Sequence, residues 1–363
     1  MTRIAAVHGV LPPYRYEQRE ITEALAALCL DAPDALGAAP GDRALLERLH
    51  AASGVEARHL VLPLGEYGAV RGFGQANDLF VVHGLALAEQ ALTGALAAAG
   101  VAPHEVDLVI STSVTGIAAP SLEARLAARV GLRPDVRRVP MFGLGCAAGA
   151  AGLALLHEHL SGHPEQTAVL LSVELCSLTL QRADTSPAGL VAGALFGDGA
   201  AAVVAVGDGR APTPGEGRPG PRVVAGRSRL HPGTERALGW EIGDSGFKIV
   251  LGAELPGLVE LHVAEEIQSF LAEHDLKPGE VTGWVCHPGG PKVLDALEQS
   301  LGLGADCLAP SRRSLAQVGN LSSASVLHIL RDTLAAGPPP AGTPGLVVAL
   351  GPGFSSELVL VRW

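Results

Sequence analysis

The chain has 363 residues, 48% of them hydrophobic and 4% aromatic, with 46 glycines and a formal net charge of −11. This length and apolar content are enough to bury a large core built from Ala, Val and Leu. The acidic balance argues against nucleic acid as a partner, because backbone phosphates require a basic surface. The 5 cysteines are odd in number and lack CxxC spacing, which argues against a disulfide framework and against a zinc site.

The first residues, MTRIAAVHGVLPPYRYEQ, lack the pattern of a signal peptide. No apolar run approaches the roughly 20 uninterrupted residues that span a bilayer. We therefore expect a cytoplasmic protein without a membrane partner.

Buried strands and helices are predicted to alternate along the chain. Residues 86–100 favour a helix, and residues 106–114 a strand. Residues 168–175, 200–206 and 345–350 have the continuous apolar character of strands that are covered on both faces. This alternation predicts a layered α/β architecture with mainly buried sheets.

A polar stretch rich in Pro and Gly, residues 207–222, interrupts this pattern. Its composition does not suit a buried strand or helix. We expect an exposed connector there, between an N-terminal half at residues 1–206 and a C-terminal half at residues 223–363.

Cys146 lies in the run GLGCAAGA, at the start of an apolar, helix-forming stretch. At a helix N-terminus, the unpaired N–H groups and the positive end of the dipole stabilise an anion and can lower the pKa of a thiol. The neighbouring glycines would let a bulky acyl group approach. A single cysteine is nevertheless more often a small buried hydrophobe, so this motif alone is only suggestive.

Two later segments each place one polar residue at the end of an expected element. In WVCHPGG an apolar strand leads into His287, with helix-like sequence from Pro291 onward. In GNLSSASV, Asn320 stands where an N-cap would precede a helix. An isolated His or Asn in such a place is usually structural. Together with Cys146 they form a candidate catalytic set.

Two enzyme classes share the chain order Cys, His, Asn. Papain-like proteases carry their cysteine in a CGSCW-type motif near the mature N-terminus, which Cys146 does not match. Condensing enzymes of the thiolase superfamily contain two related halves with catalytic groups at equivalent places. This sequence shows such a duplication: residues 106–114 resemble residues 283–288, and the helix starts at Cys146 and Asn320 correspond.

A set of segments carries a closer resemblance, which covers nearly the whole chain. The chain resembles bacterial type III polyketide synthases, the chalcone synthase family within the thiolase superfamily. The resemblance implies an α/β thiolase-like fold, in which duplicated halves give a layered αβαβα core with mixed sheets. It also implies coenzyme A thioesters as substrates and no metal or redox cofactor. The matching segments are GCAAG, GALFGDGAAA, DSGF, VCHPGGPKVL, GNLSSASVL and LGPGF.

The resemblance implies a role for each candidate residue. Cys146 would take the starter acyl group from coenzyme A, with His287 generating or stabilising its thiolate. His287 and Asn320 would donate hydrogen bonds to the thioester oxygen of malonyl-CoA, which becomes an enolate oxygen as carbon dioxide leaves. The enolate would attack the acyl group on Cys146. Phe196 and Phe247 match the two gatekeeper phenylalanines between the coenzyme A tunnel and the cavity.

Other members of the superfamily fit less well. A ketoacyl-acyl carrier protein synthase of the initiating type also uses Cys, His and Asn, but it normally shows HQAN where this chain reads HPGG after Cys286. Thiolases would offer a second active-site cysteine late in the chain, and hydroxymethylglutaryl-CoA synthases use a glutamate. A non-catalytic relative would have lost one of the three residues. The ketoacyl synthase, which condenses once, remains the alternative.

The predicted cavity residues bear on the starter. The region around Cys176 and Thr179 resembles synthases that make long-chain alkylpyrones and alkylresorcinols, and small apolar walls suit a flexible fatty acyl chain. We therefore expect a fatty acyl-CoA starter, extended repeatedly by malonyl-CoA and cyclised to a pyrone or resorcinol, with an aromatic starter as the alternative. The candidate cavity residues are Val114, Thr115, Ala119, Cys176, Thr179, Leu238, Ser322, Gly351, Pro352 and Gly353.

Coenzyme A also carries phosphates, which call for Lys or Arg at a tunnel mouth. Arg48 and Arg58 lie in the segment that resembles this region, so we expect them to bind these phosphates. The resemblance implies a homodimer as well.

Overall fold

The computed structural model describes residues 2–31, 41–210, 220–304 and 306–363. A nine-stranded mixed sheet, in the order β11-β12-β13-β8-β1-β7-β6-β4-β5, runs through it. Its two parts are joined between β8 and β1 by only two residue pairs, Thr2 with Val223 and Arg3 with Arg222. The strands are β1 (Thr2–Val10), β4 (Leu108–Thr112), β5 (Arg137–Met141), β6 (Thr167–Leu175), β7 (Asp198–Gly207), β8 (Arg222–Leu230), β11 (Gly283–Cys286), β12 (Pro344–Gly351) and β13 (Ser355–Arg362).

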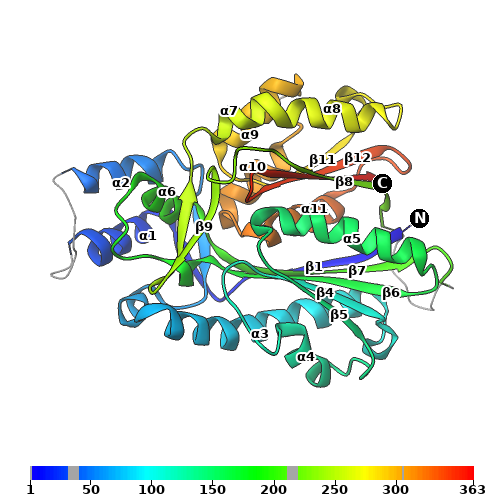
Figure 1. Ribbon diagram of the computed structural model, residues 1–363, viewed down its shortest axis with the longest axis horizontal. Coiled ribbons are helices and arrows are strands. Elements are labelled where there is room, and N and C mark those ends of the chain that lie inside the picture. Colours follow the sequence, from blue (N-terminus) through cyan, green and yellow to red (C-terminus); the bar gives the residue numbers. More distant parts are fainter. Residues whose placement is uncertain (1, 32–40, 211–219, 305) are drawn as a thin grey trace.

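Helices and the two parts of the sheet form five layers (Figure 1). One pair of helices covers one outer face, a second pair lies between the two parts of the sheet, and a third group covers the other outer face. This arrangement confirms the predicted αβαβα fold. In that order the helices are α3 (Gly72–Ala99) and α4 (Leu122–Val130); α5 (Ala148–Gly162) and α11 (Ser325–Ala336); and α7 (Leu255–Leu258), α8 (Ala264–Ala272) and α9 (Pro291–Leu301).

Strands buried on both faces explain the continuous apolar runs in the sequence. Along β6, Val169 and Leu171 join the cluster under α3, whereas Ala168 and Leu170 join the cluster around α5 and α11. Successive side chains of a strand point to opposite faces, so a strand between two helical layers needs apolar residues at every position. In β12, Leu346 and Val348 face the third cluster, beneath α8 and α9.

The two halves repeat one strand pattern. In the N-terminal half β4 pairs in parallel with β6, and β6 pairs antiparallel with β7. In the C-terminal half β11 pairs in parallel with β12, and β12 antiparallel with β13. Helix α5 precedes β6 and helix α11 precedes β12 in the same manner. The duplication inferred from the sequence is therefore confirmed, with β5 as an additional edge strand.

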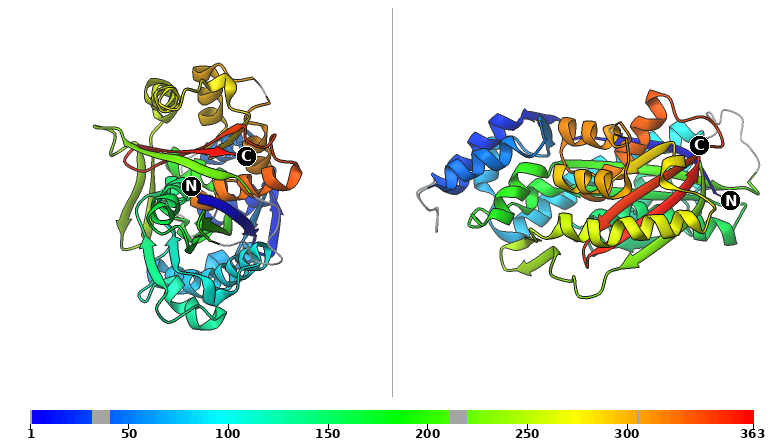
Figure 2. Two further views of the ribbon diagram at one scale, coloured as in Figure 1. Left: turned by 90° about the vertical axis from the view of Figure 1, so that its right-hand side faces the viewer. Right: turned by 90° about the horizontal axis from the view of Figure 1, so that it is seen from above.

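Smaller elements lie at one end of the molecule, and both termini lie at the opposite end (Figures 1 and 2). Two small antiparallel sheets belong to this group: β2 pairs with β3, and β9 and β10 form a hairpin. The hairpin β9–β10 lies over the region that contains the candidate residues. The elements are α1 (Gln18–Leu25), α2 (Asp42–Ala51), α6 (Pro187–Leu195), α10 (Ala309–Val318), β2 (Tyr14–Glu17), β3 (Ala57–Leu60), β9 (Leu238–Gly243) and β10 (Gly246–Leu251).

Short turns of tighter or wider helix connect several of these elements. Three of the 3-10 turns, at Gly145–Ala147, Cys176–Thr179 and Ser322–Ala324, carry candidate site residues. The others are the 3-10 turns Leu64–Ala69, Pro103–Glu105 and Pro278–Glu280, and the π-helical turns Ala26–Leu30 and Val259–Val263.

Helix α3 is longer than the helix expected at residues 86–100. Among the described residues it is the one helix that could cross a membrane by length and composition. Its side chains Phe80, Leu87, Leu92 and Leu96 are buried in the cluster that contains residues of β6 and β7. Helix α3 is therefore packed as a core helix.

The predicted connector, residues 207–222, overlaps both neighbouring strands. Strand β7 continues to Gly207, and β8 begins at Arg222. Residues 211–219 of this segment lie outside the described residues. The division of the chain at this connector remains a prediction.

Candidate active site

Cys146 lies in the 3-10 turn Gly145–Ala147, directly before α5. The thiol is partly open to a cavity, and its Sγ donates a hydrogen bond to Ser322 Oγ at 3.5 Å. Burial raises the pKa of the Cys146 thiol to about 12, although hydrogen bonds from Ser322 and Asn320 favour the thiolate. The expected lowering of this pKa by the helix N-terminus is therefore wrong for the unliganded site, because desolvation outweighs the local dipoles.

Two glycines allow the C-terminal loop to pack against the nucleophile. A Cβ at Gly145 would lie 2.6 Å from Pro352 Cδ, and a Cβ at Gly351 would lie 2.6 Å from Ala147 Cβ. Gly145 also has a φ of +51°, a conformation that favours glycine. The glycines around Cys146 therefore serve close backbone packing as well as any approach of substrate.

Asn320 sits beside Cys146 at the equivalent place in the second half. Its Oδ1 accepts hydrogen bonds from Ser322 N at 2.8 Å and from Ser325 Oγ at 3.4 Å. This use of the oxygen leaves the side-chain NH2 group as the donor toward the site. Helix α11 begins only at Ser325, after the 3-10 turn Ser322–Ala324, so Asn320 lies two residues before that turn and is not the N-cap of the helix.

His287 follows β11, where its backbone N donates to Val348 O at 2.8 Å. The side chain is 3% exposed, and burial lowers the pKa of its imidazole to about 3. Its Nδ1 has no hydrogen-bond partner within the described parts of the chain. In the described hydrogen bonds His287 is not paired with Cys146, so the expected ion pair between them is not present in this state. A neutral imidazole remains able to donate one hydrogen bond and to accept another.

A cavity opens in front of Cys146. Among the predicted cavity residues, Ala119, Thr179, Gly351 and Gly353 do not line it. Thr179 lines an adjoining cavity, whereas Gly351 packs beneath the nucleophile turn. The lining residues are Val114, Thr115, Gly145, Cys146, Cys176, Phe196, Leu238, Gly239, Trp240, Ile249, Ser322 and Pro352.

Comparison with known proteins identifies the family. Residues 42–209 match the chalcone and stilbene synthases, N-terminal domain, and residues 222–363 match the C-terminal domain of the same family. The chain belongs to this family. It is a type III polyketide synthase, a condensing acyltransferase, and this result excludes the papain-like and ketoacyl synthase interpretations.

Individual relatives agree with this assignment. The synthase is 56% identical over 363 residues to 1,3,6,8-tetrahydroxynaphthalene synthase of Streptomyces peucetius subsp. caesius, covering 100% of this chain and 93% of the relative. It is 29% identical to the alpha-pyrone synthesis polyketide synthase-like Pks18 of Mycobacterium tuberculosis, over 99% of this chain and 91% of that one. The crystal structure of 1,3,6,8-tetrahydroxynaphthalene synthase from Streptomyces coelicolor superposes with a TM-score of 0.89, at 29% identity and 99% coverage of both chains.

The two predicted gatekeepers of the synthase have different surroundings. Phe196 lines the Cys146 cavity. Phe247 is 3% exposed and does not line it, but its ring packs on Trp240 at 5.9 Å and on Phe73 at 5.2 Å between centroids. Phe247 therefore contacts the cavity wall at Trp240 and does not face the cavity itself.

Trp240 and Ile249 are site residues that the sequence interpretation missed. Both belong to the hairpin β9–β10 and are paired across its strands. Leu238 was predicted, and residues two apart on a strand face the same side. Trp240 lies two residues after Leu238, and Ile249 lies two residues after Phe247. The alternation of side chains along a strand would therefore have pointed to both residues.

Arg58 is buried and does not lie at an exposed tunnel mouth, where a phosphate ligand was expected. Its side chain is 3% exposed, and Nη1 donates to Phe196 O at 2.6 Å. Burial lowers the pKa of Arg58 to about 10. The prediction is wrong because the segment folds back into strand β3, which points this guanidinium into the protein. Arg48 is exposed on α2, where its phosphate-binding role remains a prediction.

A buried carboxylate, Glu174, supports the wall of the cavity and was also missed. Its Oε2 accepts hydrogen bonds from Val114 N at 3.1 Å and from Thr115 Oγ1 at 2.9 Å. Its Oε1 accepts a short hydrogen bond from Ser323 Oγ. Burial raises the pKa of Glu174. This side chain links the loop after β4 to the turn that follows Asn320.

Proposed function

We propose that the synthase makes 1,3,6,8-tetrahydroxynaphthalene, using malonyl-CoA both as starter and as extender. The identity of 56% across the whole chain to a synthase of that name is the observation that carries this proposal. It replaces the fatty acyl starter expected from the sequence as the first choice. The ten ring carbons correspond to five two-carbon units. Five malonyl-CoA then give one product, five carbon dioxide, five coenzyme A thiols and one water.

Loading begins with Cys146. Its thiol is neutral at rest, so the proton must leave as sulfur attacks the thioester carbonyl. Neutral His287 can take this proton on a ring nitrogen, because an uncharged imidazole keeps one lone pair as an acceptor. The acyl group passes to Cys146, and the proton returns to the departing coenzyme A sulfur.

Extension uses the same small set of donors. When malonyl-CoA loses carbon dioxide, negative charge moves to the thioester oxygen. The NH2 group of Asn320 and the N–H of neutral His287 stabilise that charge in a site with little water. The enolate carbon attacks the acyl carbonyl and releases Cys146. The product is an acyl-CoA longer by two carbons, which can load again.

Ring closure needs two new carbon–carbon bonds. The overall balance releases one water, so one closure proceeds by aldol condensation with loss of water. The other is a Claisen closure that expels the thiol.

We propose a cytoplasmic homodimer as the working form. Strand β5 is an edge of the sheet, and exposed edges are ready to pair with another chain. Apolar side chains lie exposed on or near it: Ile117 is 45% exposed, Val139 42% and Phe142 50%. A second copy packed on this edge would cover them. Ala119, predicted as a cavity residue, lies two residues from Ile117.

Mass spectrometry of the products from purified protein tests the proposal. With malonyl-CoA alone we expect the mass of tetrahydroxynaphthalene, without acyl carrier protein. Pyrones or resorcinols formed only when a fatty acyl-CoA is added would support the fatty acyl alternative. Products formed only from an aromatic starter would support the aromatic alternative and overturn the malonyl starter.

A further inference from the structure

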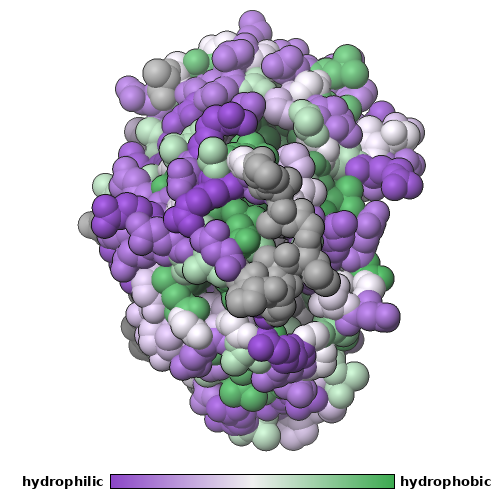
Figure 3. All heavy atoms as spheres, turned by 90° about the vertical axis from the view of Figure 1, so that its left-hand side faces the viewer, coloured by the Kyte–Doolittle hydropathy of each residue, from purple (hydrophilic) through white to green (hydrophobic). Residues whose placement is uncertain are grey.

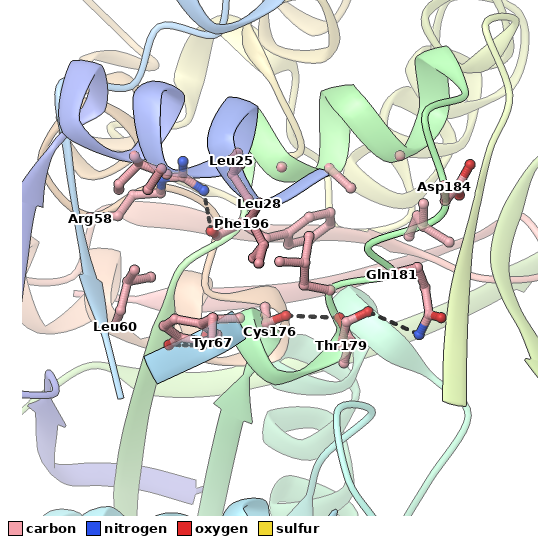
Figure 4. Close-up of a pocket in the computed structure, with 18 of the residues that line it drawn as sticks. Leu25, Leu28, Arg58, Leu60, Tyr67, Cys176, Thr179, Gln181, Asp184 and Phe196 are labelled. Atoms are coloured by element: carbon pink, nitrogen blue, oxygen red, sulfur yellow. Dashed lines mark hydrogen bonds between the residues drawn. The ribbon is translucent and has the colours of Figure 1, made fainter. Parts of the chain in front are cut away.

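A second, larger cavity adjoins the one at Cys146. It has about 810 Å³ of space free of atoms, against about 350 Å³ at Cys146, in both cases including the solvent-open mouth. Figure 4 shows its walls, with Leu25 and Leu28 projecting from the helical segment above Thr179. A smaller cavity continues from it past Leu30 and Leu46 of the α1–α2 region. On the outer face at this end, apolar side chains lie among hydrophilic ones (Figure 3).

The lining of this second cavity is mixed, since Arg58, Gln181 and Asp184 also line it, but its aliphatic side suits a hydrocarbon chain. One side consists of aliphatic residues from α1 and the turn after it, and from β3 and the segment that follows. Such surfaces favour apolar ligands, because each methylene removed from water contributes to binding. The aliphatic lining residues are Ile21, Ala24, Leu25, Leu28, Leu60 and Leu64.

Four residues line both cavities and therefore stand between them: Cys176, Phe196, Trp240 and Ile249. Cys176 follows β6 and is 6% exposed. The backbone of Phe196 is bridged to Asn320. Trp240 and Ile249 instead belong to the hairpin β9–β10, whose two strands pair with each other in a separate two-stranded sheet. Trp240 has the largest side chain of the four.

Aromatic packing holds Trp240 in this position. Its ring lies 5.9 Å from that of Phe247, and Phe247 makes an edge contact with Phe73 of α3. Gln181 Nε2 donates to Ser245 O at 3.1 Å and to Phe247 O at 3.2 Å, which ties the hairpin to the wall of the second cavity. The indole thus packs on Phe247, which in turn contacts α3 and is bonded through its carbonyl to the segment after β6.

We propose that Trp240 determines the starter, by separating Cys146 from an apolar chamber that fits the alkyl chain of a fatty acyl group. The inference rests on the proposed function, in which the starter is short. Loading a fatty acyl group forms the new thioester at Cys146 and releases coenzyme A as its thiol. The alkyl chain must then lie in the protein, and Trp240 stands between Cys146 and the larger space that would hold it.

The test compares Trp240→Ala with the wild type, using acyl-CoA starters from butanoyl-CoA to dodecanoyl-CoA. We expect kcat/KM of the variant to rise with chain length, by up to roughly fourfold per methylene, the gain for full burial of one CH2 group. The wild type should show no such rise. Intact-protein mass spectrometry should detect the dodecanoyl adduct on Cys146 earlier in the variant than in the wild type. An unchanged chain-length profile in a folded variant that still consumes malonyl-CoA would overturn the proposal.

Two further variants sharpen the test. Leu238→Ala, on the same strand and lining only the Cys146 cavity, should enlarge that cavity without producing a chain-length response. Leu28→Trp, added to Trp240→Ala, should fill the apolar chamber and cancel the gain; a retained gain would overturn the proposal.

Trp240→Phe keeps an aromatic ring against Phe247 and should show a smaller gain. It provides a second test if the alanine variant does not fold, and the absence of any gain in it would then overturn the proposal. Failure of the proposed function is a separate observation, because it concerns the product of the wild type with malonyl-CoA alone.

Discussion

Phe196 and Asn320 form a β-bridge, so a predicted gatekeeper and a predicted catalytic amide share one backbone unit. Asn320 N donates to Leu195 O at 2.8 Å, and Gly197 N donates to Asn320 O at 3.0 Å. Arg58 supports the same unit from behind through its bond to the Phe196 carbonyl. Backbone bonds of this kind fix the position of the Asn320 side chain relative to the cavity wall.

Replacing Asn320 by Ala should lower malonyl-CoA decarboxylation by roughly 10²- to 10³-fold, because one preorganised donor to the enolate oxygen is lost. Release of carbon dioxide from labelled malonyl-CoA measures this step. Ser322→Ala is the matched control, since it removes the neighbour of the thiol and keeps the amide. Normal decarboxylation by the Asn320 variant would show that its proposed role is wrong.

Cys146→Ala should abolish chain extension and keep part of the decarboxylation activity. The acyl acceptor is lost, whereas His287 and Asn320 remain in place. Chromatography of products together with carbon dioxide release separates the two activities. Polyketide formation by this variant would discard Cys146 as the nucleophile.

His287 should remain neutral at moderately acidic pH. Burial holds the pKa of its imidazole at about 3 in the folded protein, whereas an unfolded histidine titrates near about 6.5. The unfolded chain therefore binds more protons between these values, and this group lowers the free energy of unfolding as pH falls from about 6.5 toward 3. Denaturant titrations at several pH values should show a weaker decline for His287→Gln, and an identical decline would contradict the assignment.

Gly351→Ala should reduce activity at least roughly tenfold, by displacing the turn that carries Cys146. The added Cβ would lie 2.6 Å from both Ala147 Cβ and Leu144 O, so the backbone must shift; misplacement of about 1 Å can cost about 10²-fold. Steady-state kinetics and thermal melting measure the effect. Gly162→Ala, in open space on α5, is the control and should leave activity near that of the wild type. Wild-type activity of Gly351→Ala would show that the packing is not needed.

Arg48→Ala should raise KM for malonyl-CoA with little change in kcat, if Arg48 binds coenzyme A phosphates. The effect should weaken at high salt, because the contact is between exposed charges. Arg43→Ala is the control on the same helix, since Arg43 is paired with Asp31 and Glu47. Equal KM values for the two variants would place the phosphates elsewhere.

Local sequence was sufficient to locate several elements and to name three candidate catalytic residues, whose roles remain predictions. Residues 168–175 and 345–350 read as strands covered on both faces, and the structure places them in β6 and β12 between helical layers. Cys146 and Asn320 could be matched because each precedes an apolar helix in one of two similar halves. Patterns of this kind depend on neighbours in the chain, which a single sequence displays.

The protonation states and the cavity walls were decided only by the tertiary structure. Burial, which sets the pKa values of Cys146 and His287, arises from segments distant in sequence. The sequence predicted Arg58 as a phosphate ligand, but in the folded chain it lies in strand β3 with its side chain buried. Trp240 gains its place between two cavities from the packing of a hairpin against α3. Contacts across long sequence separations fix these features, and spacing along the chain does not encode them.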